Sequence, residues 1–350
     1  MEIGRETIRA LVADALELSD PELLDDDAGF GRMPEWDSLG HIRVMHALTE
    51  AFGTTIDAEA IERTLTLSKI ETFIGEQTTG SVMSSSGKDA EKALSWLWRG
   101  DVLRSDDLVY IHSRAQGLPA SLGSLMGILA WLRGRDRERT VIVPTFPFAG
   151  GEYADYLARR PRFSVRSTPA RTGLLPEIAR SLPGAVRSAH PLLSECALGE
   201  RADSLMSSTH CNPHPFHPTS TYTQMIEANA VMLGLGVDIG VNALIHWVDD
   251  RLKERYDFAI FEPEPVDFEV EFADGAIGSV TVLPYSPAMT KRIKPRMIRP
   301  IFAERADALV EGKLDGVPFY RLRLRPFLEA CLAAGKAALD DGRLPPWYPE

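Results

Sequence analysis

Cysteine, basic charge and long apolar runs are all scarce in this sequence of 350 residues. The three cysteines, Cys196, Cys211 and Cys331, are too few and too scattered to predict a disulfide framework or a cysteine-rich metal site. No apolar run approaches the roughly 18 residues of a membrane-spanning helix, and the first residues lack the apolar core of a signal peptide. We therefore expect a cytoplasmic protein with no membrane partner.

An excess of basic residues is missing as well. Thirty-eight lysines and arginines stand against 50 acidic residues, which gives a net charge of −12. Nucleic-acid binding requires a basic surface, so we expect no nucleic-acid partner. Apolar residues make up 44% of the chain, enough for a sizeable core and too many for a wholly disordered chain.

The acidic charge is concentrated at one end. Residues 1–77 contain 17 acidic and 6 basic residues, a net charge of −11, whereas the remainder is almost neutral. The sequence QTTGSVMSSSGK at 77–88 is rich in glycine, serine and threonine, a composition typical of flexible linkers. We predict an acidic domain over 1–77, a linker over 78–90 and a larger domain over 91–350.

Apolar residues in the acidic domain recur with helical spacing. The pattern predicts a helix over 4–17, a long loop over 18–37, a second helix from Ser38, a short segment capped by Asp57, and a fourth helix over 67–74. We therefore expect an all-α four-helix bundle.

The acidic domain resembles the acyl carrier protein family through this pattern and the tetrapeptide Trp36-Asp37-Ser38-Leu39. The resemblance implies that Ser38 carries 4′-phosphopantetheine, attached by a phosphopantetheinyl transferase and charged by an acyl-loading enzyme. A helix N-terminus favours the phosphodiester through its unpaired N–H groups and dipole. We expect Trp36 to pack in the core and His41 and His46 to be solvated.

The larger domain alternates between strand-like and helix-like patterns. Short β-branched runs predict strands over 108–112, 140–144, 230–235 and 268–272. Helical spacing marks 124–132, 174–181, 244–252 and 326–339. This alternation predicts an α/β fold.

Six motifs in order run through the larger domain: IHS at 111–113, PTF at 144–146, FSVRSTPARTGLLPEIAR at 163–180, GAVRSAHPLLSECALG at 184–199, HPFHPTSTY at 214–222 and NALIHWVDD at 242–250. Together they resemble the antibiotic N-acetyltransferase family typified by aminoglycoside 3-N-acetyltransferases. The resemblance implies an α/β domain of that type, and acyl transfer from a pantetheine thioester to an amine.

The same resemblance suggests which residues act. His246 matches the histidine of the family's catalytic helix, and Asp249 follows three residues later, so both lie on one helical face. A neutral imidazole suits the general base that an attacking amine requires. His190 of the RSxHP turn and Glu177 are further catalytic candidates, and Ser113 and Arg114 are candidates for binding the cofactor arm, as phosphopantetheine or a coenzyme A thioester.

Other reactive residue types have simpler interpretations. His210, His214 and His217 form a cluster near Cys211, but the surrounding prolines favour an irregular loop, so we expect no metal. We expect Cys196 to pack in the core rather than act as a nucleophile.

Departures from the family pattern shape the functional hypothesis. Arg114 and Pro119 replace small residues of the loop that holds coenzyme A phosphates in relatives, and an acid that binds aminoglycoside amines falls on Gly240, with Asp238 nearby. We therefore expect an acyltransferase that moves an acyl group from its own carrier domain to the amine, or less readily the hydroxyl, of a small natural-product precursor. Two alternatives stay open: acetyl-coenzyme A acylates an aminoacyl group held on the carrier, or the larger domain is a non-catalytic docking platform.

Overall fold

The computed structural model describes residues 5–25, 28–30, 32–36, 38–52, 63–77, 88–98, 101–114, 118–122, 125–134, 138–240, 243–302 and 308–348. Within these residues no helix is both long and apolar enough to cross a membrane.

The acidic domain is helical throughout its described part. Its elements are α1 (Arg5–Ala15), the 3-10 helix η1 (Pro21–Leu23), α2 (Ser38–Phe52) and α4 (Leu67–Gln77). Helix α1 packs against both α2 and α4, and Arg5 forms an ion pair with Glu71 at 2.7 Å. The segment expected at Asp57 lies outside the described residues, so the fourth member of the predicted bundle stays a prediction.

A seven-stranded mixed sheet forms the centre of the larger domain, in the order β4-β5-β2-β1-β6-β10-β9. Its strands are β1 (Leu108–Ser113), β2 (Thr140–Pro144), β4 (Ala185–Arg187), β5 (Glu195–Leu198), β6 (Val231–Leu235), β9 (Leu309–Leu314) and β10 (Val317–Arg323). Strands β2, β1 and β6 run parallel, whereas the outer strands pair antiparallel. The loops after β1, β2 and β6 therefore meet at one edge of the sheet.

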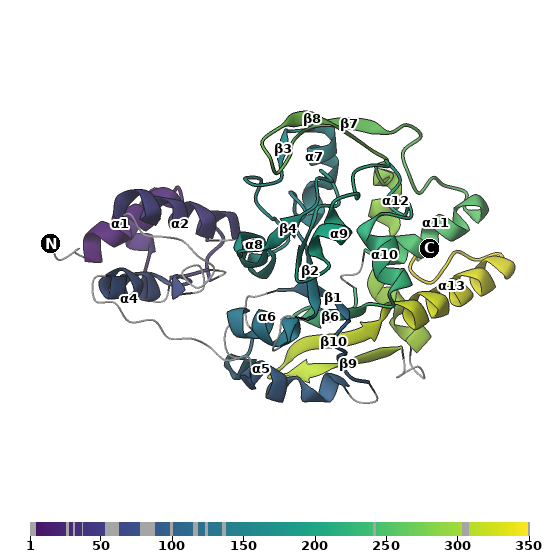
Figure 1. Ribbon diagram of the computed structural model, residues 1–350, viewed down its shortest axis with the longest axis horizontal. Coiled ribbons are helices and arrows are strands. Elements are labelled where there is room, and N and C mark those ends of the chain that lie inside the picture. Colours follow the sequence, from purple (N-terminus) through teal and green to yellow (C-terminus); the bar gives the residue numbers. More distant parts are fainter. Residues whose placement is uncertain are drawn as a thin grey trace.

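Helices cover both faces of this sheet (Figure 1). One group is α5 (Lys88–Ala93), α6 (Leu125–Arg133) and α8 (Leu174–Ser181), and the other is α9 (Ala202–Met206), α10 (Thr221–Glu227), α11 (Ile245–Leu252) and α13 (Leu324–Asp340). Successive residues of a strand face opposite sides, so Val109 and Ile111 join the first apolar cluster while Tyr110 joins the second. The predicted α/β fold is confirmed, and α8 has the bounds expected from its sequence.

A second, three-stranded sheet lies beside the first and positions one loop of the site. It contains β3 (Phe163–Ser164), β7 (Val266–Glu271) and β8 (Ile277–Val282). Phe163, Phe268 and Val270 pack there with Tyr156 of α7 (Tyr153–Arg159). The remaining elements are η2 (Ser95–Trp98), η3 (Ala120–Leu122), η4 (Gly150–Glu152), η5 (Lys253–Arg255), α12 (Pro287–Arg292) and η6 (Pro295–Phe302).

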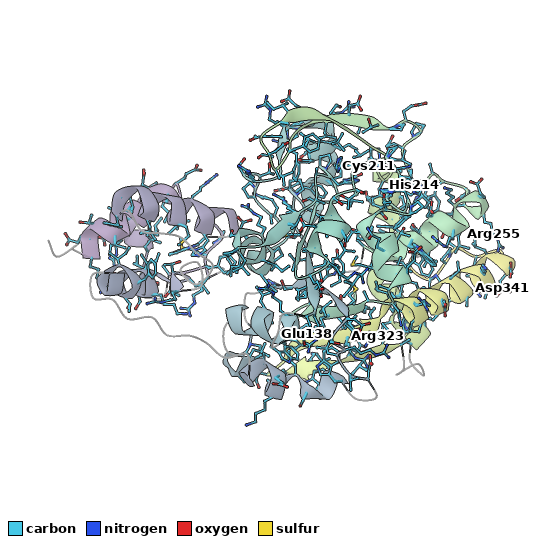
Figure 2. The ribbon with its side chains drawn as sticks, in the orientation of Figure 1. Glu138, Cys211, His214, Arg255, Arg323 and Asp341 are labelled. Carbon is cyan, nitrogen blue, oxygen red and sulfur yellow. The ribbon has the colours of Figure 1, made fainter. Side chains whose placement is uncertain are left out.

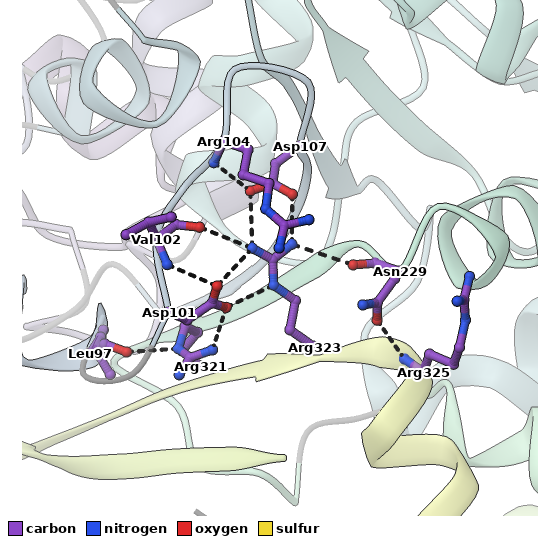
Figure 3. A network of polar contacts seen from close by, with 9 residues as sticks. All are labelled: Leu97, Asp101, Val102, Arg104, Asp107, Asn229, Arg321, Arg323 and Arg325. Carbon is purple, nitrogen blue, oxygen red and sulfur yellow. Dashed lines mark hydrogen bonds and ion pairs between the residues drawn. The ribbon is translucent and has the colours of Figure 1, made fainter. Parts of the chain in front are cut away.

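Two buried arginines of β10 attach the start of the larger domain to the sheet (Figure 3). Arg323 donates to both carboxylate oxygens of Asp101 and of Asp107, and Arg321 donates to Asp101 at 2.8 Å. Burial alone would raise the pKa of Asp101, but the hydrogen bond and charge of Arg323 outweigh it and hold that pKa below its ordinary value. This network links segments more than 200 residues apart in the chain.

The acidic domain lies at one end of the molecule, on the side of the larger domain where α8 is found (Figure 1). One apolar cluster contains buried side chains of both parts, among them Val44 of α2 and Ile178 of α8. Of the predicted linker, residues 78–87 lie outside the described residues, and residues 88–90 form the first turn of α5.

Candidate active site

His246 and Asp249 form a buried pair on α11, the helix that follows β6. The His246 Nδ1 atom lies 3.1 Å from the Asp249 Oδ2 atom, as the spacing of three residues on a helix allows. A carboxylate can only accept a hydrogen bond, so this contact places the imidazole proton on Nδ1. The Nε2 atom of His246 is then left with its lone pair, which is the form that a general base requires.

Two further donors fix the Asp249 carboxylate. The Tyr256 hydroxyl donates to Oδ1 at 3.0 Å, and the Trp347 indole N–H donates to the same oxygen at 2.8 Å. Asp249 has no exposed surface. A carboxylate held from three sides cannot rotate away from the histidine, so it fixes the orientation of the imidazole ring.

Aromatic rings form one wall beside His246. Tyr285 packs on the imidazole with ring centroids 4.6 Å apart, and Phe261 stacks on Tyr285 with ring centroids 5.4 Å apart. The Tyr285 hydroxyl is buried and makes no hydrogen bond with any residue that the structure describes. Burial raises its pKa well above the ordinary value for tyrosine, so this hydroxyl stays neutral.

His190 lies in a separate polar cluster. Its Nδ1 atom accepts hydrogen bonds from the backbone N–H groups of Leu192 and Leu193, at 3.2 and 3.0 Å. These bonds place the proton on Nε2, so His190 can donate but not accept through that atom. Burial, helped by the charges of His217 and His210, lowers its pKa to about 3 and keeps the ring neutral.

The cluster around His190 contains a buried acid that sequence reasoning missed. Glu195 of β5 lines a cavity of about 10 Å³ together with His190, Thr221 and Tyr222, which is room for about one water molecule. Burial raises the pKa of Glu195 to about 8, against the opposing effect of the hydroxyls of Thr221 and Tyr110. The only sequence signal was one glutamate at the start of the apolar strand ECAL.

Glu177 is occupied by contacts within the protein. It forms an ion pair with Arg180 and accepts a hydrogen bond from the backbone N–H of Ala170 at 2.8 Å. The side chain is almost fully buried. These contacts favour a role in holding the loop before α8 over direct contact with a substrate.

Ser113 and Arg114 lie at the carboxyl end of β1, at the edge of the sheet from which the loop to His246 departs. The Ser113 hydroxyl is buried and makes no hydrogen bond with any described residue, whereas the Arg114 side chain is exposed. The backbone of the loop after β1 packs closely against Gly236. A Cβ atom added at Gly236 would lie only 2.6 Å from the Arg114 carbonyl oxygen. Only glycine allows this approach, and the φ angle of +73° at Gly236 favours it too.

A larger cavity of about 330 Å³ lies near the same edge. It is bounded by the loop after β6, by η6 and by β9 and β10; its charged residues are Asp238, Arg299, Glu311 and Lys313. Arg299 is paired with Glu311 at 2.8 Å. Two acids and two bases give this cavity no net charge, and its volume is at the lower end of the range for small-molecule sites.

Ser38 is the first residue of α2, as the sequence predicted. Its side chain lies outside the described residues. Trp36 is fully buried, which confirms its expected packing role, and its indole N–H donates to His41 at 3.0 Å. The expectation of a solvated His41 was wrong, because this ring is fully buried and serves as the acceptor for Trp36. The side chain of His46 lies outside the described residues.

The histidine loop and Cys196 can also be placed. His214 pairs with Asp250 at 3.2 Å, and the His217 Nδ1 atom lies 2.9 Å from the Thr219 hydroxyl. Among the described residues no three metal-ligating side chains come together. Cys196 is buried, and burial raises the pKa of its thiol to about 12, so it is not a nucleophile at neutral pH.

Comparison with known families identifies the larger domain. Residues 117–325, about three fifths of the chain, match the family model described as aminoglycoside 3-N-acetyltransferase. The chain belongs to this family. Residues 6–74 match a second model, described as a phosphopantetheine attachment site. Both resemblances found in the sequence are therefore confirmed, as is membership of an acyltransferase family.

Individual relatives agree with this assignment. The chain is 29% identical over 157 residues to aminoglycoside N(3)-acetyltransferase IX of Micromonospora chalcea and to aminoglycoside N(3)-acetyltransferase VII of Streptomyces paromomycinus. These matches cover 41% of the chain and 56% and 54% of the two relatives, so the chain spans about half of their length.

Solved structures share the fold at low identity. A binary complex of AAC-IIIb with CoASH matches with a TM-score of 0.56 and 18% identity, over 71% of this chain and 95% of the other. The YokD protein of Bacillus subtilis matches with a TM-score of 0.53 and 16% identity, over 72% and 94% of the two chains.

Proposed function

We propose that this chain is an acyltransferase that moves an acyl group from phosphopantetheine on Ser38 to the amine of a small acceptor. The observation that carries the proposal is the His246–Asp249 pair, with the carboxylate buried and held by Tyr256 and Trp347. The match of residues 6–74 to a phosphopantetheine attachment site supports Ser38 as the point of attachment. It also supports a complete four-helix carrier domain, with a phosphopantetheinyl transferase and an acyl-loading enzyme as partners.

The described residues include groups that could bind the phosphopantetheine arm at its attachment point and near the active site. Ser38 begins a helix of 15 residues, whose first N–H groups and dipole favour a phosphodiester. The Ser113 hydroxyl at the sheet edge makes no hydrogen bond with a described residue, so it is available to a polar group of the arm, and Arg114 is exposed beside it. When bound, the group supplies an acyl carbon activated as a thioester.

The protein's own part in the reaction is to place the amine and move its proton. His246 Nε2 would take up the proton that the amine loses when its nitrogen replaces sulfur on the acyl carbon, and would return that proton to the leaving thiolate. Asp249 stabilises the imidazolium that forms between these steps. No covalent bond between the protein and the acyl group is needed, because bringing amine and thioester together supplies much of the rate.

The acceptor we propose is small and not strongly cationic. At the position where relatives carry an acid that binds aminoglycoside amines, this chain has Gly240, with Asp238 nearby. An aminoglycoside carries several ammonium groups, which a site without that acid binds poorly. The relatives in Micromonospora chalcea and Streptomyces paromomycinus are named as aminoglycoside acetyltransferases, so we propose that this chain differs from them in its acceptor.

The test uses the full chain, converted by a phosphopantetheinyl transferase and loaded with a labelled acyl group. Mixing with small amines should release the label as an amide, which mass spectrometry identifies. His246→Ala should load normally and transfer roughly 10²- to 10⁴-fold more slowly, the usual contribution of a general base. Ser38→Ala should not load at all.

The choice of donor needs a second measurement. The same acyl group should transfer faster from Ser38 than from a coenzyme A thioester, because the loop after His112 departs from the pattern that holds coenzyme A in relatives. Equal or faster turnover of the coenzyme A thioester overturns the donor assignment. It would support instead an acceptor amine carried on Ser38. Transfer that survives His246→Ala unchanged would refute the catalytic assignment.

A further inference from the structure

The larger domain carries one strongly basic stretch, although its net charge is near zero. Residues 156–176 contain five arginines and no acidic residue. We call residues 159–171, which hold all five, the arginine segment: Arg159, Arg160, Arg162, Arg166 and Arg171. It runs from the end of α7 through β3 to the loop before α8.

Part of this charge is neutralised and part is not. Arg162 pairs with Glu269, and Arg171 pairs with Glu152. Arg160 and Arg166 are exposed, and neither forms an ion pair with any residue that the structure describes. Arg159 is exposed as well, and its Nε donates only to the backbone carbonyl of Asp155. Three exposed guanidinium groups therefore remain in this stretch without a carboxylate partner among the described residues.

Buried contacts hold the arginine segment in a fixed shape. Arg187, which forms no ion pair with any described residue, donates to the carbonyl oxygens of Thr145, Val165 and Thr168. Arg180 of α8 donates to the Arg166 carbonyl at 2.8 Å. These hydrogen bonds already fix the backbone of the segment. Binding a partner there therefore costs little conformational entropy, which favours specific docking.

The arginine segment ends near Ser113, one of the residues proposed to bind the cofactor arm. Gly173 lies two residues beyond it, and an added Cβ atom at Gly173 would lie 3.4 Å from the Ser113 carbonyl oxygen. The Arg171 N–H also donates to the carbonyl of Phe146 in the loop after β2, at 2.8 Å. The segment thus borders the sheet edge at which β1, β2 and β6 end.

One part of the same chain has the complementary charge. The acidic domain has a net charge of −11, and the loop that leads to Ser38 exposes several carboxylates: Asp20, Glu22, Asp25 and Glu35. The acidic domain lies on the side of the larger domain where α8 is found (Figure 1). Arg180 of this helix donates the hydrogen bond to the Arg166 carbonyl. Opposite charges on two surfaces steer their encounter and fix their register.

We propose that Arg160 and Arg166 form the docking surface for the carboxylates of the loop before Ser38 when the carrier domain delivers its acyl group. The proposal rests on the function proposed above, because it assumes that Ser38 carries the donor.

The test uses two full-length chains. The donor chain carries His246→Ala, so it loads an acyl group but transfers it only slowly on its own. The catalyst chain carries Ser38→Ala, so it can only take the acyl group from its partner. Adding Arg160→Glu and Arg166→Glu to the catalyst chain should raise the KM for the donor chain roughly five- to tenfold, as reversal of two exposed ion pairs predicts. Added salt should weaken transfer by the unreversed catalyst more than transfer by the reversed one.

Controls separate docking from chemistry. Acyl-pantetheine, a small thioester without a carrier, should be turned over equally by the reversed and unreversed catalyst chains. Arg255→Glu with Arg343→Glu reverses two exposed arginines elsewhere. Arg255 and Asp341, the partner of Arg343, lie at the end of the molecule opposite the acidic domain (Figure 2), so this control should leave the KM unchanged. An unchanged KM in the Arg160/Arg166 variant overturns the proposal, whereas failure of every chain on acyl-pantetheine overturns the proposed function.

A cross-linking measurement does not depend on activity. The full-length variant Arg160→Lys with Arg166→Lys keeps both charges and introduces amines. A carbodiimide should then join these lysines to Asp20, Glu22, Asp25 or Glu35, as peptide mass spectrometry would show. Cross-links confined to other parts of the chain would overturn the docking surface.

Discussion

At the scale of single residues, the decisive group is the Asp249 carboxylate. It accepts a hydrogen bond from His246 and so keeps the imidazole proton on Nδ1. In Asp249→Asn the amide can donate its own N–H to Nδ1, which removes this control over the position of the proton. We expect this variant to lower kcat roughly 10²- to 10³-fold with little change in the KM for the acyl donor, because orientation of the base is lost while binding remains. Steady-state kinetics on the loaded chain would measure both constants.

Tyr256→Phe is the matched control for this prediction. It removes one of the donors to Asp249 and leaves both the His246 contact and the Trp347 bond in place. We expect less than a tenfold loss in kcat. A kcat that is the same in Asp249→Asn and in the unmodified chain would show that the pair has no catalytic role.

Glu195 should make stability depend on pH. Its pKa is raised to about 8 in the folded chain, against about 4.3 in an unfolded one. The folded chain therefore binds the extra proton between these values, and the associated stability is complete below about pH 4 and is lost as the pH rises through 8. Glu195→Gln is neutral throughout and should increase the free energy of unfolding at pH 8–9 by roughly 1–3 kcal/mol.

Denaturant titrations at several pH values would check this prediction. Between pH 5 and 8 the loss of stability should be smaller in Glu195→Gln than in the unmodified chain. Parallel pH curves for the two proteins would show that Glu195 does not titrate in this window.

The residue scale also shows what the sequence could and could not predict. His246 and Asp249 were found because three positions on a helix bring two side chains together whatever the rest of the fold does. Trp347 could not be linked to Asp249 in advance, because 98 positions separate them and only the tertiary fold brings them together. His41 was taken for a solvated residue because helical spacing did not reveal its bond to Trp36.

At the scale of elements, the loops after β1 and β6 touch at Gly236. Gly236→Ala would place a methyl group 2.6 Å from the Arg114 carbonyl oxygen and strain a residue at positive φ. We expect a loss of roughly 2–3 kcal/mol in the free energy of unfolding, together with a higher KM for the acyl donor, because the loops must separate.

Gly275→Ala isolates the backbone contribution. Gly275 has a φ angle of +90°, but a Cβ atom there meets nothing within 4 Å. This variant should lose about 1 kcal/mol through strain alone and keep its KM. Equal effects of the two variants on stability and KM would show that contact between the loops contributes nothing.

The network on β10 gives a second prediction at this scale. Asp101→Asn should lower the free energy of unfolding by roughly 2 kcal/mol, because it leaves Arg321 and Arg323 short of buried negative charge. The pKa of Asp101 is depressed, so its contribution is present above the unfolded pKa and is lost as the pH falls through the folded one. The variant should therefore show less acid sensitivity than the unmodified chain.

Asp341→Asn provides the comparison in thermal or denaturant unfolding. Asp341 pairs with Arg343 at 2.8 Å, but both side chains are about two-thirds exposed. Exposed pairs of this kind contribute less than about 1 kcal/mol. The prediction fails if Asp101→Asn destabilises the chain no more than Asp341→Asn does.

At the scale of the whole molecule, the tether should raise the local concentration of the acyl donor. We expect residues 1–80 and 85–350 to fold as separate pieces, because the composition of the linker predicts no packing of its own. Transfer between the pieces should then require carrier on the order of millimolar to match the intact chain. Circular dichroism of each piece, and transfer rates over a dilution series, would check both statements.

Dilution distinguishes the two possible results. Transfer in the intact chain should be independent of protein concentration, whereas transfer between the pieces should fall in proportion. Pieces that do not fold would show that the apolar cluster shared by the two parts is essential to both, and the domain boundaries would need to be redrawn.

The hydrogen bond between Asp101 and Arg323 also bears on the order in which the two domains fold during synthesis. The two residues are 222 positions apart, so this contact cannot form until β10 has been synthesised and has joined β6. Within the acidic domain, the ion pair between Arg5 and Glu71 spans only 66 positions. Since domains fold as units from the N-terminus during synthesis, we expect Ser38 to become a substrate for its modifying enzyme while the ribosome is still extending the larger domain. The arm would then be in place before the chain has the means to discharge it.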